Sequence, residues 1–282
     1  MKQSHGILLL VTCAVVWGLA FVAQSVSSGH IGPWTFNTIR FFLGFLTLLP
    51  FCWKEIANKR VWIGGVCCGV VLCLASYLQQ KGIETTVTGK AGFITSLYLI
   101  IVPFLSITTG KKVTTKNWLC VVLALAGMYL LTGMEGGGLT KGELLILLSA
   151  FCFAAHIMVI DHFKEVPGIG LSAVQFLVAS VIGVFFLPKE APRWEAIHSV
   201  LVPLLYAGIM SCAVAYTLQI IGQKYVEPAN AVLPLSLESV FSALFGFLIL
   251  GQRLSVHEIA GCAVVFSAVL LSQIDIRRQR NT

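Results

Sequence analysis

Three ionisable side chains stand within long apolar stretches of this chain, and they are the residues best placed to do chemistry. Glu238 lies about nine residues into the stretch 229–250, so a helix would hold its carboxylate roughly 14 Å from the end. A charged group in apolar surroundings needs a partner, water or a proton. We expect Glu238 either to carry a proton or to bind a cationic group in a cavity. The alternative is a hydrogen-bonded residue at a helix contact.

Arg40 and His156 raise the same question with weaker signals. Arg40 stands about six residues into the stretch 34–53, where its long side chain could snorkel to the surface, pair with a neighbouring helix or hold an anionic group. His156 lies within 142–161, and histidine exchanges protons near neutral pH, so it could relay protons with Glu238. A single histidine hydrogen-bonded inside a bundle is the simpler alternative.

Aromatic and amide side chains form a repeated pattern. The spacing Cys-x-x-x-Tyr-x-x-Gln occurs as Cys73, Tyr77 and Gln80 and again as Cys212, Tyr216 and Gln219. Tyrosine and glutamine three residues apart share one helix face. We expect the two pairs to lie at opposite mouths of a cavity, although tyrosines at a membrane interface would leave the same pattern. Trp17 and Tyr98 could offer aromatic faces to a ligand or simply pack in the core.

Lipid rather than water is the solvent in which these residues must be placed. Apolar residues make up 57% of the 282 positions and charged residues 11%, whereas soluble domains are about 25% charged. This composition excludes a water-soluble fold. The nine cysteines fall in or at the ends of apolar stretches without metal-ligand spacing, so neither a disulfide framework nor a metal site is expected. The net charge of +7 is scattered over loops, which argues against nucleic acid as a partner.

Apolar stretches of about 20 residues, the length that a helix needs to cross a bilayer, recur along the chain. We predict an all-α integral membrane protein with ten transmembrane helices. They span residues 7–26, 34–53, 61–81, 91–110, 116–133, 142–161, 169–187, 200–222, 229–250 and 255–274. With both termini in the cytoplasm, the inner segments hold twelve of the nineteen basic residues and the outer loops hold six. The positive-inside rule therefore favours cytoplasmic termini.

The glycine-rich stretch 135–141 divides the predicted spans into five before it and five after it. The second copy of the tyrosine and glutamine pattern follows the first by 139 positions, which indicates an internal duplication. An odd number of spans in each half inserts the second copy upside down. We therefore predict two inverted five-helix repeats, residues 1–134 and 142–282, an arrangement that transporters use for alternating access.

Short motifs in a fixed order resemble the EamA-type members of the drug/metabolite transporter superfamily. They are Trp17-Gly18-x-x-Phe21, Arg40-Phe41, Ala91-Gly92-Phe93-Ile94-Thr95-Ser96-Leu97-Tyr98 with Val102-Pro103, Leu237-Glu238, and Leu250-Gly251-x-x-Leu254. The resemblance covers essentially the whole chain and implies ten spans around a central cavity, with metabolites as cargo. The family often has proline after Leu-Glu, where this chain has Ser239, and glutamate after Leu-Gly, where this chain has Gln252. The kink expected near Ser239 would then come from Pro234.

The residues and the resemblance together predict a secondary carrier of small metabolites such as amino acids, an exporter in the cell membrane, driven by a proton gradient or by exchange. Its expected site residues are Glu238, Trp17, Tyr77, Gln80, Tyr98, His156, Tyr216, Gln219 and Arg40. No cofactor or metal is expected, and the partners would be the substrate, the lipid bilayer and, in a homodimer, a second copy. The alternatives are a membrane-embedded enzyme, for which no catalytic constellation is found, a non-transporting scaffold, and a channel.

Overall fold

The computed structural model describes residues 3–132 and 139–278, and within these ranges the chain forms helices and no strands. The uninterrupted long helices are α1 (Gln3–Ser28), α2 (Pro33–Cys52), α3 (Lys59–Ile83), α6 (Thr115–Thr132), α7 (Lys141–His162), α8 (Gly168–Val184) and α14 (Val256–Arg278). Most of the glycine-rich stretch predicted between the two halves lies outside the described residues. Its boundaries therefore stay a prediction.

Other segments of the chain form long rods from consecutive helical pieces. These are α4 (Thr88–Thr95) with α5 (Tyr98–Thr108), then α10 (Leu201–Leu205) with η3 (Tyr206–Tyr216) and α11 (Thr217–Gln223), and finally α12 (Pro228–Leu235) with α13 (Glu238–Leu250). The short elements η1 (Glu55–Ala57), η2 (Leu187–Lys189) and α9 (Trp194–Ser199) belong to connections between the rods. The sequence predicted each rod as one continuous helix, whereas the structure divides each into two or three helical pieces.

Among the described residues, eight helical segments are long and apolar enough to cross a membrane. Two predicted spans, 116–133 and 169–187, correspond instead to the shorter apolar helices Thr115–Leu130 and Gly168–Val184. The outward faces of the bundle carry large apolar side chains, with Val256 81% and Phe185 76% exposed. An apolar outer surface of this kind suits contact with lipid.

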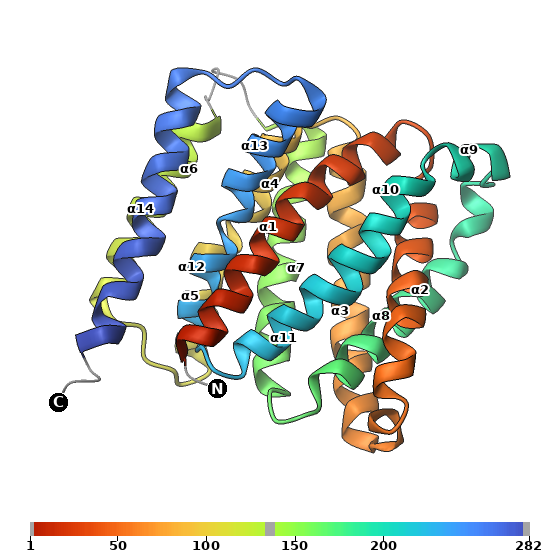
Figure 1. The fold of residues 1–282 in the computed structure, drawn as a ribbon, viewed down its shortest axis with the longest axis horizontal. Helices are drawn as coiled ribbons and strands as arrows, with labels where there is room; N and C mark the ends of the chain where they lie inside the picture. Colours follow the sequence, from red (N-terminus) through yellow and green to blue (C-terminus); the bar gives the residue numbers. More distant parts are fainter. Residues whose placement is uncertain (1–2, 133–138, 279–282) are drawn as a thin grey trace.

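The helices run up and down between two faces of the bundle (Figure 1). The start of α1 and the end of α14 lie at one end, which we call the terminal face, and the other end is called the opposite face. Helices α6 and α14 pack on each other along one side of the bundle, while α2 and α8 pack on each other at the other side. Helices α1, α3 and α7 run between these two pairs.

The rods α4–α5 and α12–α13 are broken at equivalent positions, 140 residues apart. In the first, Leu97 N donates to Ile94 O at 3.2 Å, and in the second Leu237 N donates to Pro234 O at 3.3 Å. The break in α12–α13 forms although residue 239 is serine, as the sequence allowed. The rod α4–α5 breaks in the same way with Ile94 at the position that matches Pro234, and the role of Pro234 in the bend of α12–α13 stays a prediction.

Two motif glycines bring neighbouring helices against α13. A Cβ atom added at Gly18 of α1 would overlap Phe241, and one added at Gly92 of α4 would overlap Ser242. Only glycine permits the backbones to approach this closely. The glycines of the Trp17-Gly18 and Ala91-Gly92 motifs therefore place α13, and with it Glu238, deep between α1 and α4.

Glutamate side chains tie α2 and α8 together at both faces. Glu190, which follows α8, accepts hydrogen bonds from Trp34 N at 2.9 Å and Thr35 N at 2.8 Å, at the first turn of α2. Glu55, which follows α2, accepts one from Gly170 N at 2.6 Å, at the first turn of α8. A carboxylate that accepts from the free amides at a helix start stabilises that helix. The start of α2 is thus capped by Glu190, which follows α8, and the start of α8 is capped by Glu55, which follows α2.

An ion network closes the terminal face. Lys111, after α5, lies 2.5 Å from Asp161 of α7 and 2.7 Å from Glu227, the residue before α12. Lys164 adds longer pairs with Asp161 at 3.8 Å and with Glu227 at 3.7 Å. At the opposite face Lys90 pairs with Glu143 at 2.5 Å. The pairs made by Lys111 and Lys90 join elements that precede residue 133 to elements that follow residue 139.

Candidate substrate cavity

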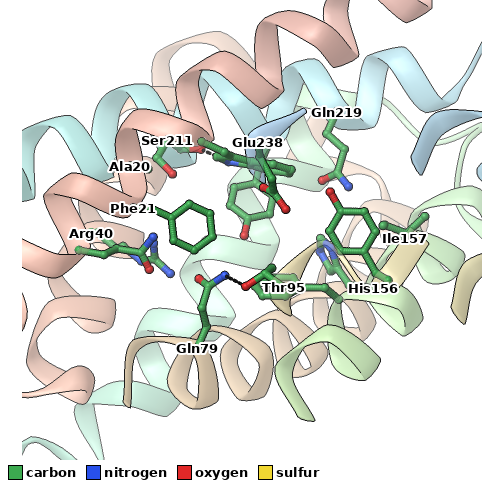
Figure 2. Close-up of a pocket in the computed structure, with 15 residues that line it drawn as sticks. Ala20, Phe21, Arg40, Gln79, Thr95, His156, Ile157, Ser211, Gln219 and Glu238 are labelled. Carbon is green, nitrogen blue, oxygen red and sulfur yellow. Dashed lines mark hydrogen bonds between the residues drawn. The ribbon is translucent and has the colours of Figure 1, made fainter. Parts of the chain in front are cut away.

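A narrow cavity lies near the middle of the bundle (Figure 2), with about 30 Å³ of space for the centres of water-sized molecules. It is lined by Trp17, Ala20, Phe21, Gln24, Arg40, Gln79, Thr95, Tyr98, Phe153, His156, Ile157, Ser211, Tyr216, Gln219 and Glu238. The lining residues come from α1, α2, α3, α4, α5, α7, η3, α11 and α13, and thus from both halves of the chain. This space is enough for about two water molecules in the conformation described.

Glu238 is the first residue of α13, directly after the break, and only 3% of its surface is exposed. Ser96, at the matching break between α4 and α5, donates from Oγ to Glu238 Oε1 at 3.2 Å. Within the described part of the chain, Glu238 forms no ion pair with a lysine, arginine or histidine. A buried carboxyl group beside the hydroxyls of Ser96 and Tyr98 can take up a proton or attract a cation.

Arg40 lies in the middle of α2 and is 2% exposed, so the prediction that it snorkels to the surface is wrong. Its guanidinium carbon lies 5.2 Å from the centre of the Phe36 ring and 4.8 Å from that of Phe41. These ring contacts favour the positive charge. Among the described residues, however, Arg40 Nε and Nη2 have no hydrogen-bond partner. The side chain reaches the cavity because the side of α2 that carries Arg40 packs inward against η3 and α8.

Aromatic rings form one wall of the cavity. Trp17 meets Tyr216 edge to face with 4.7 Å between ring centres, and Tyr216 meets Phe176 at 5.7 Å. Phe176 stacks on Phe41 at 5.8 Å. Trp17 Nε1 also donates to Ser211 O at 3.3 Å. That carbonyl belongs to η3, an 11-residue π-helix, whose wider turn leaves carbonyl groups free to accept such bonds.

His156 lies at the cavity, but its described hydrogen bond is with Gln175 of α8, at 2.9 Å from Nε2 to Oε1. Its ring meets Tyr216 edge to face at 5.9 Å between centres. No described contact joins His156 directly to Glu238. The predicted proton relay between these two residues is therefore not formed in this conformation.

The two copies of the tyrosine and glutamine pattern occupy different environments. Tyr216 and Gln219 line the cavity, whereas Tyr77 stacks on Trp34 at 4.1 Å, toward the opposite face. Gln80 donates from Nε2 to Gln24 O at 3.1 Å. The prediction that the pairs mark two symmetric mouths is wrong, because Tyr216 lies inside the cavity and Tyr77 lies outside it. The tertiary packing of α3 against α7 and α8 turns Tyr77 away.

Several cavity residues were missed by sequence reasoning. Gln79, rather than its neighbour Gln80, faces the cavity, where its Nε2 donates to Thr95 Oγ1 at 3.1 Å. Gln24 and Phe153 also line the cavity. The pair Gln79-Gln80 near the end of an apolar stretch was a usable signal, since both side chains needed polar surroundings. Which of the two faces the cavity depends on the rotation of α3.

Within the described residues, no cluster of three or more histidine, cysteine, aspartate or glutamate side chains is placed to hold a metal ion. The cavity instead combines a buried carboxyl group, a buried guanidinium, several amides and aromatic rings. This combination can bind a small polar molecule, and Glu238 can exchange a proton or a cation.

Comparison with known proteins gives a consistent result over the whole length. The EamA-like transporter family matches residues 4–133 and again residues 140–273. An uncharacterized transporter of Archaeoglobus fulgidus is 29% identical over 98% of this chain and 88% of its own length. The threonine/homoserine exporter RhtA of Escherichia coli K12 is 25% identical over 97% of this chain and 92% of its own length. A solved crystal structure with 19% identity shares the fold, with a TM-score of 0.81 over 99% of both chains.

Proposed function

The chain belongs to the EamA-like transporter family as a multi-pass membrane protein, and from this premise we propose that it is a secondary carrier of small metabolites. The observation that carries the proposal is the central cavity, to which both halves of the chain contribute side chains. A cavity held between two halves can open to one side at a time as the halves rock against each other.

Three observations support ten spans arranged as two inverted five-helix repeats. The family matches each half separately, the broken rods α4–α5 and α12–α13 share their backbone hydrogen bonds, and α2 and α8 cap each other. In an inverted repeat, one rotation would relate the two matched halves, the two broken rods, and helices α2 and α8. With this topology both ends of the chain lie on one side, and the abundance of basic residues there favours the cytoplasm.

Glu238 is proposed as the coupling residue. Its carboxylate is buried, it has Ser96 as a hydroxyl donor, and it lines the cavity. The ionisable groups that surround it in the cavity are Tyr98, His156, Tyr216 and Arg40, with Cys13 of α1 nearby. A proton and a cationic group of the substrate would occupy this carboxylate in turn, so the movement of one would drive the other in the opposite direction.

Metabolite export, with amino acids as a cargo class, is the proposed direction of transport. The support is the likeness to RhtA, whose name describes a threonine/homoserine exporter, and a cavity with polar ends and an aromatic wall. A membrane-embedded enzyme or a scaffold would be expected to give no flux, and a channel would give flux without saturation or counterflow. Transport measurements therefore separate all of these classes.

The test is flux in liposomes that contain the purified protein, measured for a panel of amino acids with and without a pH gradient. We expect saturable, pH-driven flux and counterflow from the wild type. E238Q should lose the response to the pH gradient, because glutamine cannot take up the proton. The matched control is E165Q, which changes an exposed glutamate in the loop between α7 and α8. Unchanged pH dependence in E238Q would reject the coupling role.

A further inference from the structure

The buried guanidinium of Arg40 is not explained by the packing of the protein. It is 2% exposed, and its Nε and Nη2 atoms lack hydrogen-bond partners among the described residues. An arginine stays charged in proteins, so a buried guanidinium with free donors is costly unless something accepts from them. The rings of Phe36 and Phe41 contact its carbon but cannot accept all of its N–H groups.

No protein carboxylate fills this role within the described part of the chain. Arg40 forms no ion pair there, and Glu238, the acid in the same cavity, accepts from Ser96 instead. The cavity therefore holds a cation and an acid that are not bonded to each other. Both side chains line the cavity, and in the view of Figure 2 the ring of Phe21 lies between them.

The chemistry of the two groups differs in a way that indicates an oriented ligand. A guanidinium binds carboxylates through two parallel N–H···O bonds, which fix both position and direction. A carboxylate in apolar surroundings attracts an ammonium group or a proton. A molecule with an anionic end and a cationic end would satisfy both residues at once, while the aromatic wall would accommodate its apolar part.

We infer that the substrate is a zwitterion, with its anionic group on Arg40 and its ammonium group on Glu238. This inference rests on the proposed carrier function and adds which residue holds each charged group and how the substrate is oriented in the cavity. A compound with only one of the charges leaves the other protein group unpaired. Discrimination against such compounds is strong when the unpaired group is buried.

The first experiment measures binding and needs no transport. Purified protein in nanodiscs is titrated with glycine, β-alanine, γ-aminobutyrate and 5-aminovalerate, and with an acid and an amine of the same chain length as the best ligand. We expect one chain length to bind most tightly and the acid and amine to bind at least about 30-fold more weakly. Equal affinity for the zwitterion and for either single-charge compound would overturn the inference.

The second experiment compares R40Q with the matched control R193Q, which changes an exposed arginine in the loop before α9. R40Q should weaken zwitterion binding at least about 30-fold, and R193Q should not. The ligand-free R40Q protein should be as thermally stable as the wild type or more stable, because a buried charge without partners has been removed. Wild-type affinity in R40Q would overturn the inference, and so would a large loss of stability in ligand-free R40Q.

The outcomes also separate this inference from the carrier function. If a purely cationic or purely anionic compound is transported and its flux does not depend on Arg40, the protein is a carrier but the proposed zwitterionic substrate is rejected. Arg40-dependent binding of zwitterions without flux or counterflow in liposomes supports the ligand assignment and refutes the carrier.

Discussion

In the rod α4–α5 the first residue after the break is Tyr98, whereas at the matching position of α12–α13 it is Glu238. Three backbone hydrogen bonds at the first break have counterparts at the second, and both side chains line the cavity. One break thus presents a neutral phenol and the other an acid. The comparison teaches that a duplicated backbone can place two residues symmetrically while only one of them carries the ion chemistry.

The outer ends of the same rods differ in a second way. Near the start of α4, Thr88 Oγ1 donates to Gln252 Oε1 at 2.5 Å, a contact between neutral groups. Near the start of α12, Glu227 instead binds Lys111, which also binds the buried Asp161. The contacts before α12 therefore form a network of charges, whereas the start of α4 combines a neutral hydrogen bond with a single ion pair, Lys90 with Glu143. We expect the two faces to open with different free energies.

The largest expected effect comes from exchanging the two residues at the breaks. In Y98E/E238Y the carboxylate moves to a position where the matching serine, Ser236, already donates to Leu233 O at 2.7 Å. Without a free hydroxyl donor, the moved carboxylate should not restore coupling, and pH-driven flux should fall to the level of empty liposomes. Y98F, which keeps Glu238, is the control and should retain most of the flux. Full coupling in the exchanged protein would show that the two broken rods are interchangeable.

The ion network should contribute more than the neutral contact at the other face. K111M removes hydrogen bonds to Asp161 and Glu227, and Q252M removes one to Thr88. We expect amide hydrogen exchange in the first turn of α12 to rise about tenfold in K111M, and exchange in the first turn of α4 to rise about threefold in Q252M. Equal increases at the two ends would remove the contrast between them.

The glutamates that cap α2 and α8 should also differ in how much they stabilise the protein, and this difference should be smaller. Glu190 accepts from Trp34 N and Thr35 N and also from Thr35 Oγ1 at 2.7 Å, whereas Glu55 accepts from Gly170 N. Replacing a capping side chain with alanine costs about 0.5–2 kcal/mol. We expect E190A to lie near the upper end of this range and E55A near the lower end. Thermal unfolding in detergent measures both, and a larger loss in E55A would contradict the ranking.

The smallest effect is the pH dependence of the ion network. The hydrogen bond from Lys111 lowers the pKa of Glu227, so its stabilising contribution is present above about pH 4.3 and is lost as the pH falls through the lowered value. For Lys111, burial lowers the pKa, but bonds to Asp161 and Glu227 outweigh it, and the net shift is upward. Its contribution is therefore present up to about pH 10.4 and is lost only above that value.

We accordingly expect the network to be constant between about pH 5 and pH 10 and to weaken in acid. Glu227 is 57% exposed, so solvent screening keeps its share within about 1 kcal/mol. Melting temperatures of wild type and E227Q, measured from pH 3.5 to pH 8, should converge at the acid end. A difference in melting temperature between wild type and E227Q that increased below pH 4 would contradict the stabilising role of ionised Glu227.

The helical architecture could be predicted from the sequence because lipid imposes a simple requirement. Each spanning segment needs about 20 apolar residues and internal backbone hydrogen bonds, and both are visible in composition and spacing. The depth of Glu238 followed from the same counting. A kink near Glu238 was expected from Pro234, but the break before Tyr98 and the π-helix η3 were not foreseen, because they change backbone hydrogen bonds without changing the apolar pattern.

The orientation of side chains around each helix was decided by the tertiary structure. Arg40 faces the cavity rather than the surface, Gln79 rather than Gln80 lines it, and Tyr77 stacks on Trp34 outside it. A helix that is apolar all round gives no signal of which face is inward. That choice is made by close helix contacts, such as those at Gly18 and Gly92.

By itself the sequence determined that this chain is a helical membrane protein with an acid placed deep in an apolar segment. Those properties depend on residue type and on distance along the chain. The meeting of Arg40 and Glu238 in one cavity was decided only by the tertiary structure, since they lie 198 positions apart in the sequence. Their proximity depends on how α2 and α13 pack, and packing is a property of shapes in three dimensions.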